Sequence, residues 1–365
     1  MARLVYAFPT ALSTPEAQMF PGMARYSHVF KLYGGWVMPV DRTGHITIPV
    51  KNISLFSMPA YRAFSKTYEE ICNDRATELL KKADALDIGI NVMYSGGIDS
   101  TCLLVSLLKQ ATAEQKKRIT VLLSHESIAE NPRFYEEYIK KNLRVGSSIT
   151  FPELIGGNDM LLSAEHNDLV MGNASVSSMI TRYGFETVHK SYTREFLVDF
   201  FEGTLNDHDA AVFYFELFDR LNKTAPIEIS SNFDFMWWYN FATKWQACFC
   251  YILFYTLPEN THKITKEYLD TRFISFYNTD EFQLWSMNNL DKRIKDTWKS
   301  YKWVMKDIIY NFNKDAEYRD NKTKVRSLPI VMKQHPIHFP LLDEEFRFRN
   351  DLKPKDFLLP ENDFA

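Results

Sequence analysis

The segment from which the fold is best predicted is Asn91-Val92-Met93-Tyr94-Ser95-Gly96-Gly97-Ile98-Asp99-Ser100-Thr101. Its first four residues predict a short, mostly apolar strand, and apolar residues at helical spacing follow the two glycines. Gly96 and Gly97 lack the Cβ atoms that would keep a phosphate away from the backbone, and glycine tolerates positive φ angles. The amides of the loop and the first helical turn would point at an anion, and the helix dipole adds to the attraction. The stretch therefore predicts a strand, a phosphate-binding loop and a helix.

The side chains of this loop indicate what accompanies the phosphate. Ser95, Ser100 and Thr101 offer hydroxyl donors. Asp99 would repel a polyphosphate unless a cation lay between them, so we predict that Asp99 holds Mg²⁺, which neutralises the leaving group. The Walker A spacing Gly-x-x-x-x-Gly-Lys-Ser/Thr is absent. A bare glycine pair would indicate a tight turn capped by Ser100, but the six-residue pattern between a strand and a helix favours a functional loop.

A strand–helix rhythm surrounds the loop and predicts an α/β fold, with a parallel sheet and helices on both faces. The strands expected from apolar runs lie at 88–94, 118–124, 148–151 and 168–171. The strand signal fades after about residue 185, and a mainly helical C-terminal part follows. Its expected helices lie at 190–222, 234–256, 264–271, 279–289 and 293–313.

These patterns predict four regions along the chain. They are an N-terminal strand and hairpin region at 1–60, a nucleotide-binding α/β domain at 61–185, a helical region at 186–330, and an extended C-terminal tail at 331–365. The hairpin pattern runs from His28 to Val50, and its apolar runs are separated by Gly34-Gly35 and by Asp41-Arg42-Thr43-Gly44.

Composition excludes several classes of protein. With 43 basic and 46 acidic residues, the chain lacks the basic excess of a dedicated nucleic-acid-binding protein, although a local basic face remains compatible with one. Four irregularly spaced cysteines form neither a disulfide framework nor a zinc set. The most apolar stretch, Ala247 to Leu257, is far shorter than the ~20 residues that span a bilayer, and no signal peptide is apparent. We expect a soluble, cytoplasmic protein with no membrane partner.

The loop resembles the Ser-Gly-Gly-x-Asp-Ser/Thr signature of the PP-loop, or N-type ATP pyrophosphatase, superfamily. The resemblance implies an adenine nucleotide α-hydrolase-like fold, with ATP and Mg²⁺ as cofactors. It implies adenylation of a carbonyl or carboxylate oxygen, release of pyrophosphate into this loop, and displacement of AMP by a nitrogen or sulfur nucleophile. It also implies that the adenine packs near the end of the second strand, around Leu122, Leu123 and Ser124.

Residues 60 to 330 resemble the synthetase domain of asparagine synthetase and β-lactam synthetase in three further segments. Lys302-Trp303-Val304-Met305-Lys306 is similar to Lys-x-x-Leu-Arg, with Lys306 in the place of the arginine. Arg319 followed by Lys322 and Lys324 is similar to an Arg-x-Lys segment whose lysine stabilises the adenylate and the transition state. The range 272–281 is loosely similar to Arg-x-Pro-Phe-Leu-Asp. Positioned cations favour the departure of pyrophosphate, so Lys322 or Lys324 is expected to contact phosphate, and the choice between them stays open.

Two departures from that family narrow the function. Met1 and Ala2 stand where asparagine synthetase has its glutamine-hydrolysing cysteine, so free ammonia, an amine substrate, an intramolecular amine or a partner protein would supply the nucleophile. The family's acidic loop, Gly-x-Gly-x-Asp-Glu, has its best counterpart around Gly172, in a segment without a carboxylate. Either Asp159 replaces that ligand, or the metal relies on Asp99 and water, or the activity is altered.

The favoured function is an ATP-dependent ligase that adenylates a small molecule carrying a carboxylate or carbonyl and forms an amide-type C–N bond. One alternative is modification of a nucleobase in tRNA or DNA by the same chemistry, and another is a non-catalytic nucleotide-binding protein. Tyr239, Lys244 and Gln246 would line a substrate pocket or belong to a packed aromatic core. His125 or Glu126, at the end of the second strand, would face the nucleotide or act as an acid or base.

Overall fold

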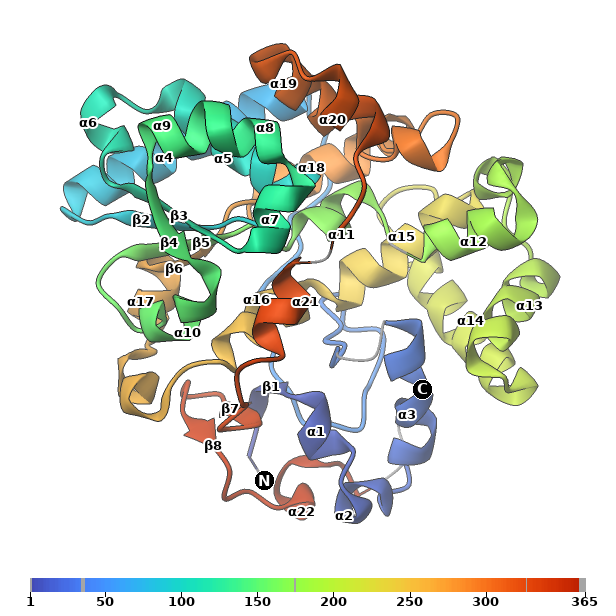
Figure 1. Ribbon diagram of the computed structural model, residues 1–365. Coiled ribbons are helices and arrows are strands. Elements are labelled where there is room, and N and C mark those ends of the chain that lie inside the picture. Colours follow the sequence, from blue (N-terminus) through green and yellow to red (C-terminus); the bar gives the residue numbers. More distant parts are fainter. Residues whose placement is uncertain (1, 34–36, 174, 326, 361–365) are drawn as a thin grey trace. The chain divides into compact units, whose positions relative to one another are not determined.

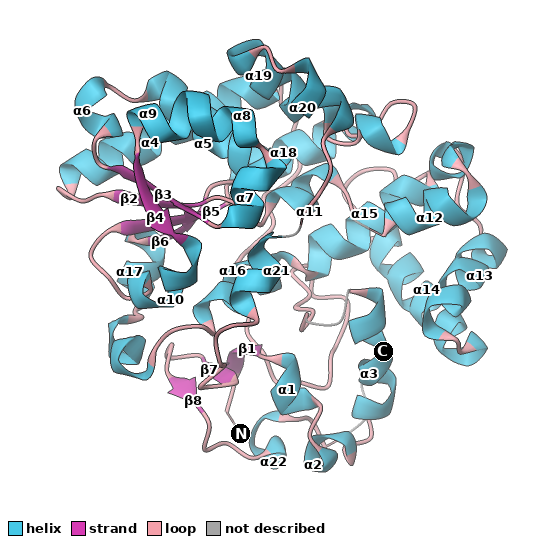
Figure 2. Cartoon of the chain, viewed as in Figure 1, coloured by secondary structure: helices cyan, strands magenta, loops and turns pink. Residues whose placement is uncertain are grey.

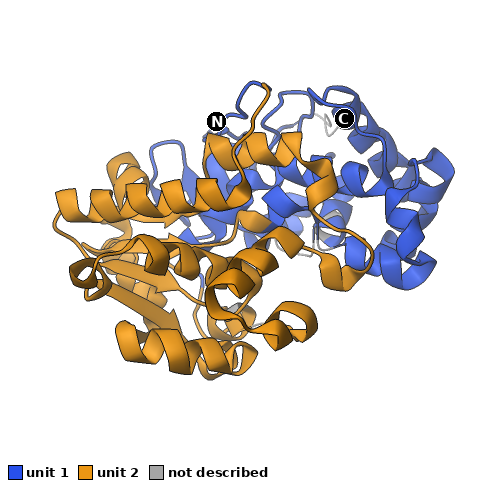
Figure 3. Cartoon of the chain, turned by 90° about the horizontal axis from the view of Figure 1, so that it is seen from above, with its two compact units in different colours: residues 1–61, 168–254, 337–365 blue, residues 62–167, 255–336 orange. Residues whose placement is uncertain are grey.

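The computed structural model of this 365-residue chain describes residues 2–33, 37–173, 175–325 and 327–360. It divides into two compact units, shown in different colours in Figure 3. Unit 1 is formed by Met1–Tyr61, Asp168–Phe254 and Ile337–Ala365, and unit 2 by Arg62–Asn167 and Tyr255–Pro336. Both units thus combine segments that are distant in the sequence. The helical region expected at 186–330 is shared between them, because strand pairing brings residues 273–275 back to the sheet of unit 2.

Unit 2 contains a five-stranded sheet in which all strands are parallel (Figure 2). The order of its strands is β4-β3-β2-β5-β6. Their bounds are Ile90–Met93 for β2, Ile119–Leu123 for β3, Arg144–Ser147 for β4, Met160–Ser163 for β5 and Phe273–Ser275 for β6. In register, Ile90 lies between Ile119 and Met160. The predicted α/β class with a parallel sheet is confirmed.

Helices cover this sheet, with α4 (Tyr68–Ala85) and α5 (Ile98–Gln110) on one face and α17 (Lys266–Thr271) on the other (Figure 1). Thr67 caps α4 in a box with Glu70, which satisfies the first free amides of the helix. The remaining α-helices of unit 2 are α6 (Ala113–Lys116), α7 (His125–Glu130), α8 (Pro132–Phe134), α9 (Lys140–Asn142), α10 (Phe151–Leu154), α18 (Asp280–Asn288), α19 (Trp303–Asn313), α20 (Ala316–Asn321) and α21 (Ser327–Met332).

Two predicted strands were wrong. The strand expected at 148–151 is a 3₁₀ turn followed by α10, and the neighbouring strand β4 ends at Ser147. The strand expected at 168–171 belongs to the helix α11 (Asn167–Met171). Leu169, Val170 and Met171 are all buried. A short apolar run indicates that the segment is buried, but it does not distinguish a strand from a buried helical turn.

Unit 1 contains a small antiparallel sheet in the order β1-β7-β8. Its strands are β1 (Leu4–Ala7), β7 (Leu341–Asp343) and β8 (Phe348–Arg349), and α22 (Pro354–Phe357) follows. Part of the tail that was expected to be extended pairs with β1 in this sheet, and Leu341 and Leu342 are buried. The other helices of unit 1 are α1 (Pro9–Leu12), α2 (Pro15–Gln18), α3 (Met23–Leu32), α12 (Val176–Tyr183), α13 (Arg194–Leu205), α14 (His208–Lys223), α15 (Asn232–Thr243) and α16 (Trp245–Leu253).

The hairpin predicted between His28 and Val50 is not present among the residues described there. Helix α3 occupies its beginning, and Gly34-Gly35 lies outside the described residues. The apolar run after these glycines is a buried coil, and its backbone is hydrogen-bonded to the end of α15. The amide of Val40 donates to the carbonyl of Thr243 at 2.8 Å, and a packed helix end thus replaces the expected partner strand.

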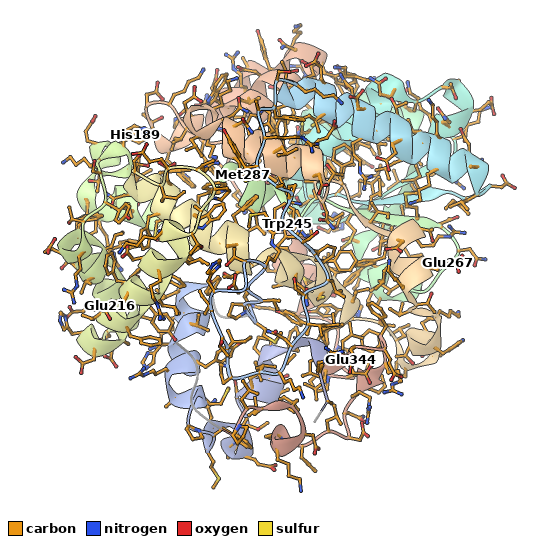
Figure 4. The ribbon with its side chains drawn as sticks, turned by 180° about the vertical axis from the view of Figure 1, so that it is seen from behind. His189, Glu216, Trp245, Glu267, Met287 and Glu344 are labelled. Atoms are coloured by element: carbon orange, nitrogen blue, oxygen red, sulfur yellow. The ribbon has the colours of Figure 1, made fainter. Side chains whose placement is uncertain are left out.

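The aromatic cluster of α15 and α16 is the core of unit 1. The indole of Trp237 donates to the carbonyl of Leu169 at 2.9 Å. Gln246 is fully buried, and its amide bonds to the backbone around Val5 and Leu55. Trp245 lies among interior side chains, whereas Glu216 projects from the outer side of the same unit (Figure 4). These contacts favour the packed core over a wall of a substrate pocket.

Candidate active site

The glycine loop lies at the point where the strand order of unit 2 reverses. Strands β3 and β4 lie on one side of β2, and strands β5 and β6 lie on the other. The loop 95–97 follows the carboxyl end of β2 and leads into α5. In open parallel sheets, ligands bind outside the carboxyl ends of the strands at such a switch point. The segments that follow β5 and β6 bring Asn167 and Tyr277 to the same edge.

The backbone of the loop requires glycine at its centre. Gly96 has a φ of +76°, and a Cβ atom there would lie 2.4 Å from the carbonyl oxygen of Ser127. Gly97 is the N-cap of α5 and has no side chain with which to cap it, so the first amides of the helix remain suited to an anion. The hydroxyl groups of Ser95 and Ser100 lie 3.0 Å apart and fix the turn from inside.

Asp99, in the first turn of α5, meets a cation that belongs to the chain itself. The Nζ atom of Lys302 donates to both carboxylate oxygens of Asp99, at 2.8 and 2.6 Å. The side chain of Lys302 is 8% exposed and that of Asp99 is 24% exposed. The amide of Asn167 also donates to the Asp99 carboxylate. Burial raises the pKa of Tyr277 well above its ordinary value, so its hydroxyl keeps the proton that it donates to the Asp99 carbonyl at 2.8 Å.

This arrangement does not fit the Mg²⁺ ion predicted at Asp99. Mg²⁺ requires oxygen ligands in octahedral geometry, and here nitrogen donors of Lys302 and Asn167 occupy the Asp99 carboxylate. In the part of the chain that the structure describes, no group of three His, Cys, Asp or Glu side chains could hold a metal ion. A metal ion at Asp99 would have to displace these nitrogen donors from the carboxylate.

A second buried ion pair borders the loop. Lys322 donates to the carboxylate of Glu130, and these side chains are 9% and 2% exposed. The amide of Val325 donates to the other oxygen of Glu130 at 2.8 Å. A Cβ atom on Gly97 would lie only 3.5 Å from the oxygen that Lys322 contacts. Of the two candidate lysines, the structure thus brings Lys322 to the loop, whereas Lys324 is exposed.

The segment that carries Lys322 is fastened to the loop on both sides. Burial raises the pKa of Tyr318 well above its ordinary value, and the hydroxyl donates to the carbonyl of Gly96 at 2.7 Å. Beyond Lys322, the hydroxyl of Ser327 donates to the carbonyl of Ser95 at 3.2 Å. These two hydrogen bonds hold the segment against the loop, and the ion pair with Glu130 holds the ammonium group of Lys322.

The residues expected beside the adenine lie at the end of β3. Leu122 and Leu123 are buried, and Ser124 is the N-cap of α7, where its hydroxyl accepts from the amide of Ser127 at 3.3 Å. His125 is exposed. A hydrogen bond from Ser124 lowers the pKa of Glu126, so this carboxylate stays ionised. The adenine contact remains a prediction for these residues.

Asp159, one candidate for the second acidic ligand, lies at the end of the sheet away from the loop. The carboxylate of Asp159 accepts from the amide of Gly89 at 2.8 Å, immediately before β2. It therefore lies at the amino ends of β2 and β5, opposite the edge that carries the loop. Gly172 belongs to unit 1 and follows α11 with a φ of +150°.

This position predicts a small effect for the variant Asp159→Ala. We expect a loss of about 1 kcal/mol in the free energy of unfolding, because one hydrogen bond to Gly89 is removed. The rate of ATP-dependent pyrophosphate release should equal that of the unmodified protein. Chemical denaturation and a coupled pyrophosphate assay measure the two quantities. A folded variant that has lost pyrophosphate release would return Asp159 to the site.

Several residues of the site were not anticipated. Asn167 follows β5, a strand that was not predicted because glycines precede its short apolar run. The sequence signal that could have identified Asn167 is its position as a polar residue after a buried strand. Lys302 opens the segment that resembles Lys-x-x-Leu-Arg, but the pattern itself singles out only Lys306, in the place of the arginine. Glu130 stands directly before the helix start at Asn131-Pro132, and no pattern there indicates a partner.

Comparison with family models, curated proteins and solved structures gave no match to this chain. Within the described residues, no helix is both long enough and apolar enough to cross a membrane.

Proposed function

We propose that unit 2 binds ATP through the loop Ser95–Ser100 and cleaves it between the α- and β-phosphates, as a PP-loop pyrophosphatase. The observation that carries this proposal is the position of the loop, at the carboxyl end of β2 and at the switch point of a parallel sheet. Its substrate would be a small molecule with a carboxylate or carbonyl oxygen, and the product an amide-type bond.

The chemistry consists of two substitutions. The substrate oxygen attacks the α-phosphorus, the bond to the bridging oxygen breaks, and pyrophosphate leaves with the electron pair. A nitrogen nucleophile then attacks the activated carbon, and AMP departs. The amides of the loop and the ammonium groups of Lys302 and Lys322 would stabilise the charge that grows on the leaving pyrophosphate.

The test is product analysis with ATP and a panel of carboxylic acids, each offered with ammonia or an amine. We expect AMP and pyrophosphate in equal amounts, and neither ADP nor inorganic phosphate. An ATP analogue with a methylene group between the α- and β-phosphates should bind without turnover and serves as the control. Formation of ADP would contradict the proposal, and ATP binding without any product would favour a non-catalytic nucleotide-binding protein.

A further inference from the structure

The cation on Asp99 is held in an unusual way. Lys302 has a φ of +61°, a left-handed conformation that is unfavourable for a residue with a side chain. Its backbone amide donates to the carbonyl of Arg293 at 2.9 Å, which fixes this conformation at the start of α19. Strained residues persist where the surrounding structure enforces them, and they cluster at functional sites. The strain here places a buried ammonium group on both oxygens of Asp99.

Lys302 is one of several lysines that converge on this part of unit 2. Lys306 is half-buried one helical turn further along α19. Burial lowers the pKa of Lys306, and the charges of Lys322 and Lys302 lower it further. Lys322 and Lys302 approach the loop through Glu130 and Asp99. The ammonium group of Lys306 donates to the carbonyl of Lys299 and lies close enough to both of these lysines for their charges to lower its pKa.

The three ammonium groups stand against the two carboxylates of Asp99 and Glu130, and the remaining positive charge favours an anion at this place. Lysine binds phosphate as a point charge, and each buried ammonium carries a desolvation cost that a polyphosphate would help to offset. A divalent cation normally provides this neutralisation by bridging a carboxylate and the phosphates. Both oxygens of the Asp99 carboxylate instead accept from Lys302.

We propose that Lys302, Lys306 and Lys322 together neutralise the polyphosphate at this loop, and that binding there requires no divalent cation on Asp99. Asp99 is then the group that positions Lys302, and it is not a metal ligand. This inference rests on the proposed function, because it concerns how the same site holds its phosphates.

The test is calorimetric titration of the full chain with inorganic pyrophosphate, in EDTA and in Mg²⁺. We expect dissociation constants that agree within about threefold in the two conditions, a difference well under 1.4 kcal/mol. In EDTA, Lys302→Met should weaken binding by about tenfold or more, which corresponds to the loss of one charge-assisted contact. Lys117→Met is the matched control, because Lys117 is an exposed lysine before β3, at the opposite edge of the sheet.

Lys302→Met leaves the Asp99 carboxylate without its ammonium partner and lowers stability, so two further variants are measured beside it. Asp99→Asn keeps the ammonium of Lys302, and pyrophosphate binding in EDTA should survive. The double variant Asp99→Asn, Lys302→Met removes both charges, and we expect it to fold and to bind weakly. Folding of each variant is checked by circular dichroism.

The outcomes separate this inference from the function on which it rests. Pyrophosphate binding that appears only with Mg²⁺, or that Asp99→Asn abolishes in a folded protein, overturns the inference and leaves the ATP site in place. Unchanged affinity of folded Lys302→Met in EDTA also overturns it. Absence of both pyrophosphate and ATP binding in either condition overturns the inference and the proposed function together.

Discussion

Replacing Gly96 by alanine is expected to abolish nucleotide binding and to lower the free energy of unfolding by about 2–4 kcal/mol. The backbone at Gly96 has a φ of +76°, which alone costs an alanine about 1–2 kcal/mol. The added methyl group would also lie 2.4 Å from the carbonyl oxygen of Ser127 and 2.8 Å from the Cβ atom of Glu130. Both neighbours belong to α7, so relief of the clash must move the loop or the helix that holds Glu130.

The matched control is Gly44→Ala in unit 1. Gly44 has nearly the same backbone conformation, with a φ of +75°, but no described heavy atom within 4 Å of an added Cβ. The control therefore carries the conformational cost of about 1–2 kcal/mol without the clash, and nucleotide binding should be unchanged. Denaturant titration and calorimetry with ATP compare the two variants. Normal ATP affinity in Gly96→Ala would contradict the role of this loop.

The strands that flank the loop could be predicted because their sequences are clearly bounded. The apolar runs of β2 and β3 each end at polar or glycine residues that begin a helix. Strands β5 and β6 carried weaker signals, since Met160–Ser163 is brief and Phe273–Ser275 lies among helices. Strand β6 forms by pairing with β5, which lies more than a hundred residues earlier in the chain. Such pairing cannot be predicted from the local sequence.

The candidate site, like the sheet, could be predicted where its signals are local and not where they depend on distant residues. The loop from Ser95 to Thr101 was identified from its own residues, because glycine conformation and helix-start chemistry are local. The partner of Asp99 was not, because Lys302 lies 203 residues further along the chain. The sequence predicted a cation beside Asp99, because a carboxylate and a polyphosphate repel each other unless a cation lies between them. Whether the cation is a metal or a lysine depends on tertiary structure.

The second large effect is expected from Lys322→Met. This change removes the ammonium partner of a Glu130 carboxylate that is 2% exposed, and breaking a buried ion pair costs about 3–5 kcal/mol. It should also lower the rate of pyrophosphate formation by about 10²–10³, because a positioned cation is lost beside the leaving group. Lys324→Met is the control. Lys324 is exposed two residues away, and we expect stability and turnover close to those of the unmodified protein.

A double variant separates the structural part of this effect from the catalytic part. Glu130→Gln combined with Lys322→Met leaves no unpaired charge, so most of the lost stability should return, as when a buried pair is replaced by neutral groups. Pyrophosphate formation should stay low, because the cation is still missing. Thermal denaturation and the pyrophosphate assay are read on the same preparations. If the double variant recovers turnover, Lys322 acts only by packing against Glu130; if Lys324→Met is the inactive one, the lysine that faces the phosphates is Lys324.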